Sequence, residues 1–221
     1  MNFLGNLLTK SPAANFNYNI GDKVDNYNDA FNPMSLWDLH DGTKKDDQKT
    51  PVSIFSFDKK ANPDESIISL LKSTILRSKT LRHPGCVTYL EDFDTPEKLY
   101  LVTEHAIPLK IQFQEYKNRE GQKIEAAAQG LFSIANTLKF MHEAGLVHDN
   151  ICSSSIFVDR AGLWKLMGLE YVHKVTDPAT RKVQNALTRY DPPEIDKNSK
   201  NKRIIVAGDT WRMGCLQEGG S

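Results

Sequence analysis

The spacing of hydrophobic residues divides the chain into a first part rich in short strands and a second part that begins with a long helix. Apolar and polar residues alternate along much of the first part, which is typical of strands that bury one face. The alternation predicts strands at residues 16–20, 35–39, 52–57, 87–90 and 99–104. A charged stretch at residues 41–50 is expected to be a turn between the second and third strands. Together these segments predict a small antiparallel sheet.

Two other stretches repeat their apolar residues every three or four positions, which is the spacing of a helix. The first follows residues 62–63, where Asn62 is the expected N-cap and a proline suits the first turn, and it continues to Leu81 with Leu76 on its apolar face. The second covers residues 122–144 and is expected to end at Gly145. Its apolar stripe consists of Ile124, Ala127, Leu131, Ile134, Leu138 and Met141. Such a stripe predicts a helix packed against a core.

A tight hairpin follows the second helix. Residues 156–158 and 163–166 are short apolar runs, and they are joined by an Asp-Arg-Ala-Gly turn. An Asp-to-Gly connection between two apolar runs favours a β-hairpin. The polar loop between helix and hairpin begins at His148, which has no nucleophile beside it in the sequence. A core histidine is therefore favoured there over a catalytic base.

Composition and charge exclude several classes of protein. The chain has 221 residues, 39% of them hydrophobic, and can bury a core in one domain or two lobes. Its 28 Lys and Arg residues balance 28 Asp and Glu residues, so no net field attracts it to nucleic acid or membrane. Three widely spaced cysteines without a CxxC pair favour a reducing compartment. No segment has the length and apolarity of a membrane span, a signal peptide or a lipid-anchor motif.

The order of a helix, a Val-His pair, a polar loop and a hairpin with an Asp-to-Gly turn resembles the centre of a protein kinase. That resemblance implies an α+β fold with two lobes. The N-lobe, a small antiparallel sheet with one helix, would cover residues 1–106, and an incomplete helical C-lobe would cover residues 107–216. A polar tail would follow at residues 217–221.

Five positions depart from the chemistry of a kinase. A kinase uses a strand Lys with a helix Glu, a catalytic Asp, an Asn that binds metal, and the Asp of a D-F-G motif. Counted along the resemblance, these positions hold Phe55, Thr74, Asn150, Ser155 and Gly168. An amide cannot accept a proton near neutral pH, and neither serine nor glycine supplies a carboxylate for magnesium. The sequence therefore predicts a pseudokinase without catalytic residues, bound cofactor or metal.

An alternative with residual activity stays open at this point. A kinase covers the phosphates with a glycine-rich loop, but this chain has only Gly21 between Ile20 and Leu36. In an atypical protein kinase with residual ATP-dependent phosphotransfer, Asp149 would act as the base and a lysine such as Lys23 would reach the phosphates. The loss of a general base typically costs about a hundred- to ten-thousand-fold in rate. The sequence therefore favours a pseudokinase that acts as a non-catalytic adaptor over the atypical kinase.

The last third of the chain resembles the segment that follows the active site in kinases. Residues 171–190 correspond to the activation segment and are expected to be a solvated loop. Its threonines include Thr176, Thr180 and Thr188. Residues 190–194 are similar to the close of that segment, and residues 209–214 are similar to the opening of a buried helix. The resemblance implies that Asp209 caps backbone amides of the loop at His148.

The motifs PVSIF, KTLRHP, LYLVTE, VDRAG-WKL and YDPPE are similar to those of the Scy-like (N-terminal-kinase-like) pseudokinases, over residues 15–216. In that family a kinase-like domain precedes helical HEAT repeats, and members are non-catalytic adaptors in Golgi-to-ER coatomer traffic and nuclear tRNA export. The resemblance implies a cytoplasmic scaffold, also peripheral at the Golgi, that binds coatomer or tRNA-export proteins. The basic runs at residues 44–45 and 197–203 are interrupted by acids or Asn, so any contact with tRNA is expected to be weak or indirect.

Overall fold

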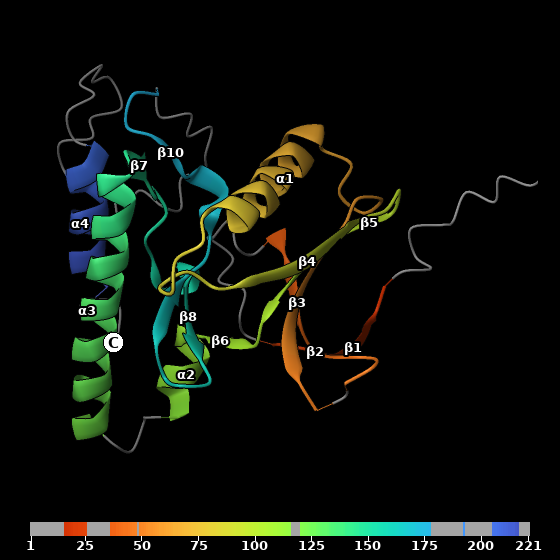
Figure 1. Ribbon diagram of the computed structural model, residues 1–221, viewed down its shortest axis with the longest axis horizontal. Helices are drawn as coiled ribbons and strands as arrows, with labels where there is room; N and C mark the ends of the chain where they lie inside the picture. Colours follow the sequence, from red (N-terminus) through yellow and green to blue (C-terminus); the bar gives the residue numbers. More distant parts are fainter. Residues whose placement is uncertain are drawn as a thin grey trace, which may run out of the picture.

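The computed structural model describes residues 16–25, 36–47, 49–115, 120–177, 192 and 205–216. Figure 1 shows two lobes side by side, one built from a sheet with a single helix and the other mainly helical. The chain passes from the first to the second between β5 and β6. This arrangement confirms the α+β, two-lobed fold that the sequence predicts.

The N-lobe contains a five-stranded antiparallel sheet with the strand order β1-β2-β3-β5-β4. Its strands are β1 (Tyr18–Lys23), β2 (Asp38–Lys44), β3 (Pro51–Asp58), β4 (Tyr89–Asp94) and β5 (Lys98–Glu104). β3 lies in the centre, and its six inner residues are all buried. The strand buries Ser53 and Ser56 as well as its apolar residues, and the alternation of serine with apolar residues is why the sequence located it closely.

Two strands of this sheet, β2 and β4, differ from the sequence expectation. The second strand does not end at residue 39, because residues 41–44 continue the ladder with β3 as far as the pair between Thr43 and Pro51. These residues were expected to form a turn, but a strand that exposes one face carries polar side chains there. The fourth strand begins at Tyr89 rather than residue 87 and extends to Asp94 for the same reason.

Helix α1 (Glu65–Thr80) covers one face of the sheet. Its N-cap is Asp64, whose side chain accepts a hydrogen bond from the amide of Ser66 at 2.8 Å, so the expected N-cap at Asn62 is wrong by two residues. The side chains buried on this helix are Ile68, Leu71, Thr74, Ile75 and Ser78. Leu76 was expected on the apolar face but is 62% exposed, because it points away from the sheet.

The C-lobe consists of helices on short antiparallel strands. Its elements are β6 (Ala106–Pro108), α2 (Leu109–Glu115), α3 (Glu120–Glu143), β7 (Leu146–Val147), η3 (Ser153–Ser155), β8 (Ile156–Asp159), β9 (Trp164–Leu166), η4 (Leu169–Tyr171), β10 (His173–Lys174) and α4 (Ile205–Cys215). β8 and β9 form the predicted hairpin, in which the Asp159 carboxylate accepts hydrogen bonds from the amides of Ala161 and Leu163. Gly145 ends α3 with a φ of 70°, as its position at the helix end predicts.

Helix α3 buries the C-terminal part of its predicted stripe against the hairpin. Ile134, Leu138 and Met141 belong to an apolar cluster with residues of β8 and β9. Position 130 requires glycine because α3 packs closely against Trp164: a Cβ there would lie 2.0 Å from the Trp164 ring. Ile124, the first residue of the stripe, is 68% exposed, so that part of the prediction is wrong. The helix extends beyond the core at this end.

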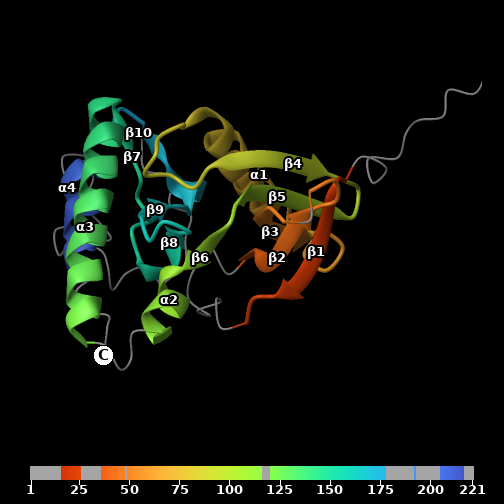
Figure 2. The ribbon, with the colours of Figure 1, turned by 60° about the horizontal axis from the view of Figure 1, so that its bottom comes forward.

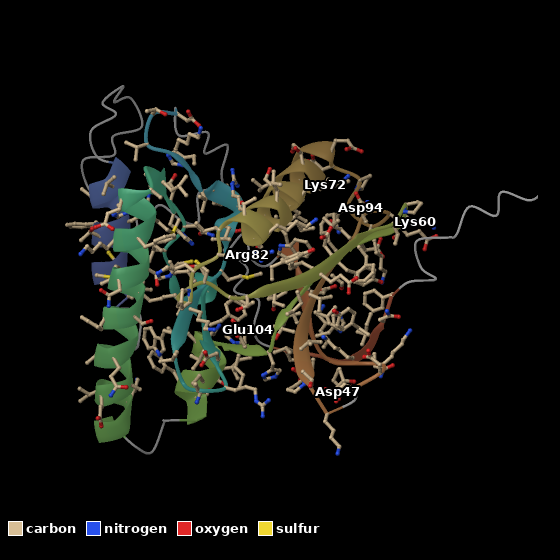
Figure 3. All side chains as sticks on the ribbon, viewed as in Figure 1. Asp47, Lys60, Lys72, Arg82, Asp94 and Glu104 are labelled. Carbon is tan, nitrogen blue, oxygen red and sulfur yellow. The ribbon has the colours of Figure 1, made fainter. Side chains whose placement is uncertain are left out.

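The two lobes are joined by main-chain hydrogen bonds as well as by packing. The turn after α1 pairs with β9: the Leu166 amide donates to the Gly85 carbonyl at 2.7 Å, and the Val87 amide donates to the Leu166 carbonyl at 2.9 Å. Lys165 of β9 forms an ion pair with Glu104 at 2.7 Å, at the end of β5 where the chain leaves the N-lobe (Figure 3). Figure 2 shows the β8–β9 hairpin between α3 and the N-lobe sheet. The hairpin is therefore the structural link between the lobes.

Several sequence expectations fall outside the described residues. These are the stretch from 178 to 190 with Thr180 and Thr188, most of residues 190–194, the basic run at 197–203 and the tail at 217–221. Thr176 is described, and its side chain is exposed.

Candidate functional site: a kinase cleft without kinase chemistry

Phe55, which the sequence comparison with kinases assigns to the strand-lysine position, packs between residues of the two lobes. It lies on β3 and is fully buried. Its ring meets Trp37 edge to face with centroids 6.4 Å apart, and it meets Phe157 of β8 in the same way at 5.8 Å. Met167, which follows β9, belongs to the same apolar cluster. A single apolar core therefore runs from the N-lobe sheet into the C-lobe hairpin, at the place where a kinase has its phosphate-binding lysine.

Thr74 is the residue that the sequence predicts at the position of the helix glutamate. It is fully buried on α1, and its hydroxyl donates to the Leu70 carbonyl at 3.4 Å. One turn later, Arg77 donates from Nη1 to the carbonyl oxygens of Leu169 (2.9 Å) and Glu170 (2.5 Å). Burial lowers the pKa of Arg77, and the nearby Glu170 opposes that shift. Helix α1 is thus attached to η4 through a guanidinium group that binds backbone carbonyls. The Lys–Glu pair that joins this helix to the strand in a kinase has no counterpart at Phe55 and Thr74.

Asn150 and Gly168, which the sequence predicts at the positions of the catalytic Asp and the D-F-G Asp, contact each other. The Asn150 side-chain amide donates to the Gly168 carbonyl at 3.1 Å. Gly168 has a φ of 73°, and a Cβ there would lie 2.9 Å from both the Asn150 amide nitrogen and the Ser155 Cβ. This loop conformation therefore requires glycine, because a side chain at position 168 would be strained by both the φ angle and these contacts.

Ser155, which the sequence predicts at the position of the metal-binding Asn, makes both hydrogen bonds of its hydroxyl within its own turn. Its hydroxyl donates to the Cys152 carbonyl at 3.0 Å and accepts from the Cys152 amide at 3.1 Å. The side chain is buried. These two bonds close the short η3 turn, so the hydroxyl stabilises the loop locally.

The loop from His148 to Asn150 is held by a buried network of charges. The Asp209 carboxylate on α4 accepts hydrogen bonds from the amides of His148 and Asp149, both at 2.8 Å, and contacts Nε2 of His142 at 3.1 Å. Burial opposes the charge on Asp209, but these hydrogen bonds keep its pKa below the usual range. Asp209 therefore caps loop amides as its sequence position implies.

Asp149 lies in this network and does not face the space between the lobes. Its carboxylate pairs with Nη2 of Arg212 at 2.8 Å, and Nη1 of the same guanidinium lies 3.5 Å from Asp209. Both members of the pair with Arg212 are buried. Asp149 also has a φ of 58°, the left-handed region that few non-glycine residues adopt. The chain is therefore bent so that this carboxylate meets Arg212.

His148 is a neutral core histidine. It is fully buried, and its Nε2 contacts the Met167 carbonyl at 3.0 Å while Nδ1 accepts from the Asn150 amide at 3.2 Å. These partners place the proton on Nε2. Burial lowers the pKa of His148 to about 4. The ring links the loop to the residue after β9 and carries no charge near neutral pH.

Within the described part of the chain, no group of His, Cys, Asp and Glu side chains is arranged to hold a metal ion. None of the helices in those same ranges is long and apolar enough to cross a membrane. A hollow of about 470 Å³ lies between α3 and α4, lined by residues that include Leu138, His142 and Met213. This hollow is remote from Phe55 and shares no lining residue with the kinase positions.

Sequence reasoning missed four residues that organise this region. Arg77 and Arg212 bind carbonyls and carboxylates in the interior, and Trp37 and Glu170 meet beneath α1. Arg77 had a visible signal, since it lies three residues after Thr74 on the same helix face. Nothing local in the sequence indicates that the Glu170 carboxyl is buried.

Comparison with known proteins agrees with this geometry. The model of the protein kinase domain family matches residues 43–217. "Probable inactive serine/threonine-protein kinase scy1" of Dictyostelium discoideum is 36% identical over 221 residues, which cover 96% of this chain and 25% of that protein. "Protein-associating with the carboxyl-terminal domain of ezrin" of Mus musculus is 34% identical over 118 residues, covering 53% and 15% of the two chains. "Cytoplasmic export protein 1" of Saccharomyces cerevisiae is 31% identical over 142 residues, covering 64% and 17%.

The chain belongs to the protein kinase domain family, as the match over most of its length shows. Within that family it is a Scy1-like pseudokinase domain, which confirms the resemblance in the sequence. It spans about a quarter or less of the length of these relatives.

Proposed function

We propose that this chain is a catalytically inactive pseudokinase domain that acts as a protein-interaction scaffold. The observation that carries the proposal is the buried Phe55 at the position of the phosphate-binding lysine, packed between Trp37 and Phe157. Aromatic rings cannot neutralise phosphate charge, and they occupy space that a nucleotide would need. One of the relatives is itself named a probable inactive kinase.

The geometry disfavours the atypical kinase. Asp149 would have to break its buried ion pair with Arg212 to act as a base, and removing one partner from such a pair costs about 3 to 5 kcal/mol. Lys23 lies on the edge strand β1, where its ammonium pairs with Asp38 at 2.5 Å. Neither group is placed to serve the reaction that the alternative requires.

Surface charge supports a protein partner over a nucleic acid. Several N-lobe lysines are paired with acids: Lys72 with Asp94 at 2.8 Å, Lys79 with Asp92 at 2.6 Å, and Lys60 with Glu97 (Figure 3). Lysines neutralised in this way release few counterions from a phosphate backbone. Direct binding of tRNA by this domain is therefore expected to be weak.

The family suggests the pathway in which the scaffold works. By resemblance, the parent protein acts in the cytoplasm and at the Golgi surface, in coatomer traffic between Golgi and ER or in nuclear tRNA export. One relative is named a cytoplasmic export protein, and another is named for its association with ezrin. By this resemblance, the partners of this chain are expected to be proteins of coatomer traffic or of tRNA export.

Nucleotide binding provides the first test. The domain is heated with and without ATP and magnesium, and its melting temperature is followed by scanning fluorimetry. We expect no shift, whereas a ligand at 100 times its dissociation constant would stabilise the fold by about 2.7 kcal/mol. A magnesium-dependent rise in melting temperature would contradict the proposal. If labelled phosphate is also transferred, and Asp149→Asn abolishes that transfer, the atypical kinase is correct.

Partner capture provides the second test. This chain and a full-length Scy1-like relative are compared in parallel pulldowns for coatomer subunits and tRNA-export factors. Recovery of either set by this chain would support a binding surface in the kinase-like lobes. Tight, salt-sensitive binding of tRNA by this chain in a gel shift would overturn the view that the domain binds proteins.

A further inference from the structure

Glu170 is a buried acid that the loss of kinase chemistry does not explain. It is 2% exposed and lies in η4, two residues after Gly168. Its Oε2 atom is 3.5 Å from the Asn150 side-chain amide, and its Oε1 atom has no hydrogen-bond partner. The indole N–H of Trp37 is also buried without a partner. The two groups are close enough for Trp37 to favour the charged form of the carboxyl, but their geometry falls short of a hydrogen bond.

The groups that face Glu170 come from three elements. Helix α1 contributes the hydroxyl of Thr74 and the guanidinium of Arg77. The loop after β7 contributes Asn150, which is neutral, and the segment before β2 contributes Trp37. Arg77 is the charged group among them. It donates to the carbonyls of Leu169 and Glu170, so it binds the backbone of η4 and makes no ion pair with the carboxylate.

Burial is the dominant influence on this carboxyl. It raises the pKa of Glu170 to about 7, although its own backbone amide, Thr74, Arg77 and Trp37 all favour the charged form. A neutral carboxyl costs less to bury here than an ionised one, because Arg77 is engaged with backbone carbonyls and forms no ion pair with it. Ionisation would therefore favour a position of η4 farther from α1, in which water reaches the carboxylate.

We propose that Glu170 and Arg77 form a proton-linked latch that holds α1 against η4 while the Glu170 carboxyl is neutral and loosens when that carboxyl ionises. The latch connects the N-lobe helix to the segment after β9, at the place where an active kinase uses its Lys–Glu pair and D-F-G motif. It makes the position of α1, and so the shape of the surface around it, depend on pH near neutrality. This inference rests on contacts that are independent of the proposed scaffold function.

The sign of the effect follows from proton binding. The pKa of Glu170 in the folded state, about 7, lies above its ordinary value of 4.5, so the folded state holds a proton that the unfolded chain has released between those pH values. The contribution of Glu170 to latch closure is present at the acid end and is lost as the pH rises through about 7. Between pH 6 and pH 8 the ionised fraction rises from about a tenth to about nine tenths.

Hydrogen exchange tests the latch directly. Amide protection of α1 and η4 is measured on the full chain at pH 6 and pH 8 and corrected for the intrinsic exchange rate. In the wild type we expect protection of residues 70–80 and 169–171 to fall by about tenfold at pH 8. Glu170→Gln, which mimics the neutral acid in size, should keep the same protection at both pH values. Glu97→Gln is the matched control, since Glu97 is an exposed acid and should leave the wild-type behaviour unchanged.

Either of two results would overturn the latch: equal protection of wild-type α1 at both pH values, or the same pH-dependent loss in Glu170→Gln. An infrared titration of the wild type covers the case in which the variant does not fold. A protonated-carboxyl band should disappear with a midpoint near pH 7. Its disappearance near the ordinary glutamate value would show that Glu170 is already ionised at neutral pH, and the latch would be excluded.

Discussion

The interlobe space around Phe55 and the loop at His148 have lost the same chemistry in opposite ways. Around Phe55, the residue assigned to the strand-lysine position is a ring that packs into an apolar core. In the loop, the residue assigned to the catalytic position is Asn150, and a network of buried charges centred on Asp209 and Arg212 lies beside it. One region has become apolar, and the other has remained ionic without its catalytic group.

The difference follows from what each set of residues contacts. In a kinase the helix glutamate pairs with the strand lysine, which binds the nucleotide phosphates, so both positions are available for packing in a domain that binds no nucleotide. Asp209 instead supports the backbone of the loop, and its amide contacts do not depend on catalysis. A buried charge network also cannot be dismantled one residue at a time, because each loss leaves another charge without compensation.

The largest expected effect tests the ionic region. Arg212→Ala removes the guanidinium that pairs with Asp149 and approaches Asp209, and it should lower the free energy of unfolding by about 3 to 5 kcal/mol in urea titrations. Lys139→Ala, which removes an exposed pair with Glu143 on α3, is the control and should change stability by less than about 0.5 kcal/mol. Equal losses in the two variants would show that the network does not support the loop.

The next effect is a pH dependence that belongs to His148. Its pKa of about 4 in the folded state lies below the ordinary 6.5, so its contribution to stability is complete above pH 6.5 and declines as the pH falls towards 4. His148→Gln should remove on the order of 3 kcal/mol of this acid-side loss. The measurement is the unfolding free energy of wild type minus that of the variant, at each pH across that range. The opposite contribution of Glu170 is the same in both proteins and cancels in this difference. Parallel pH profiles would contradict a neutral buried ring.

A smaller effect distinguishes the apolar region. Phe55→Leu keeps an apolar side chain between Trp37 and Phe157 and should cost less than about 1.5 kcal/mol, because cores tolerate similar apolar residues. Phe55→Lys, which restores the kinase residue, should be clearly more harmful, since Thr74 offers no carboxylate to pair with the buried ammonium. Denaturant titration of both variants decides the point. A lysine variant as stable as the leucine variant would show that the space is open to water.

The sequence predicted the elements whose burial is strong and continuous. β3 and the C-terminal half of α3 were located closely because their apolar residues follow the period of a strand and of a helix, respectively. The hairpin was predicted from its Asp-to-Gly turn, and the family from motifs around it. The five kinase positions could be counted from the same motifs, but their contacts, such as the approach of Asn150 to Gly168, are not visible in the sequence.

The failures occurred where polar residues take part in structure. Residues 41–44 were expected to be a turn, yet they extend β2 because the sheet exposes one of its faces. Asp64 caps α1 in place of Asn62. Asn and Asp both suit an N-cap, so the sequence alone did not distinguish the two positions. Arg77, Arg212 and Glu170 are charged residues in the interior. Sequence periodicity assigns charged residues to the surface, so it cannot find groups that are buried through long-range partners.

The smallest expected effect is also the most local. Ile75 and Leu76 are neighbours on α1, but Ile75 is buried in the core against the sheet and Leu76 is 62% exposed. Leu76→Ala should change the free energy of unfolding by less than about 0.5 kcal/mol, as surface substitutions do. Ile75→Ala should cost about 2 to 5 kcal/mol, because it leaves a cavity beside Leu71 and Phe55 in the same cluster. If the two variants were reversed in stability, α1 would be rotated by one position, and both Thr74 and Arg77 would lose their places beside Glu170.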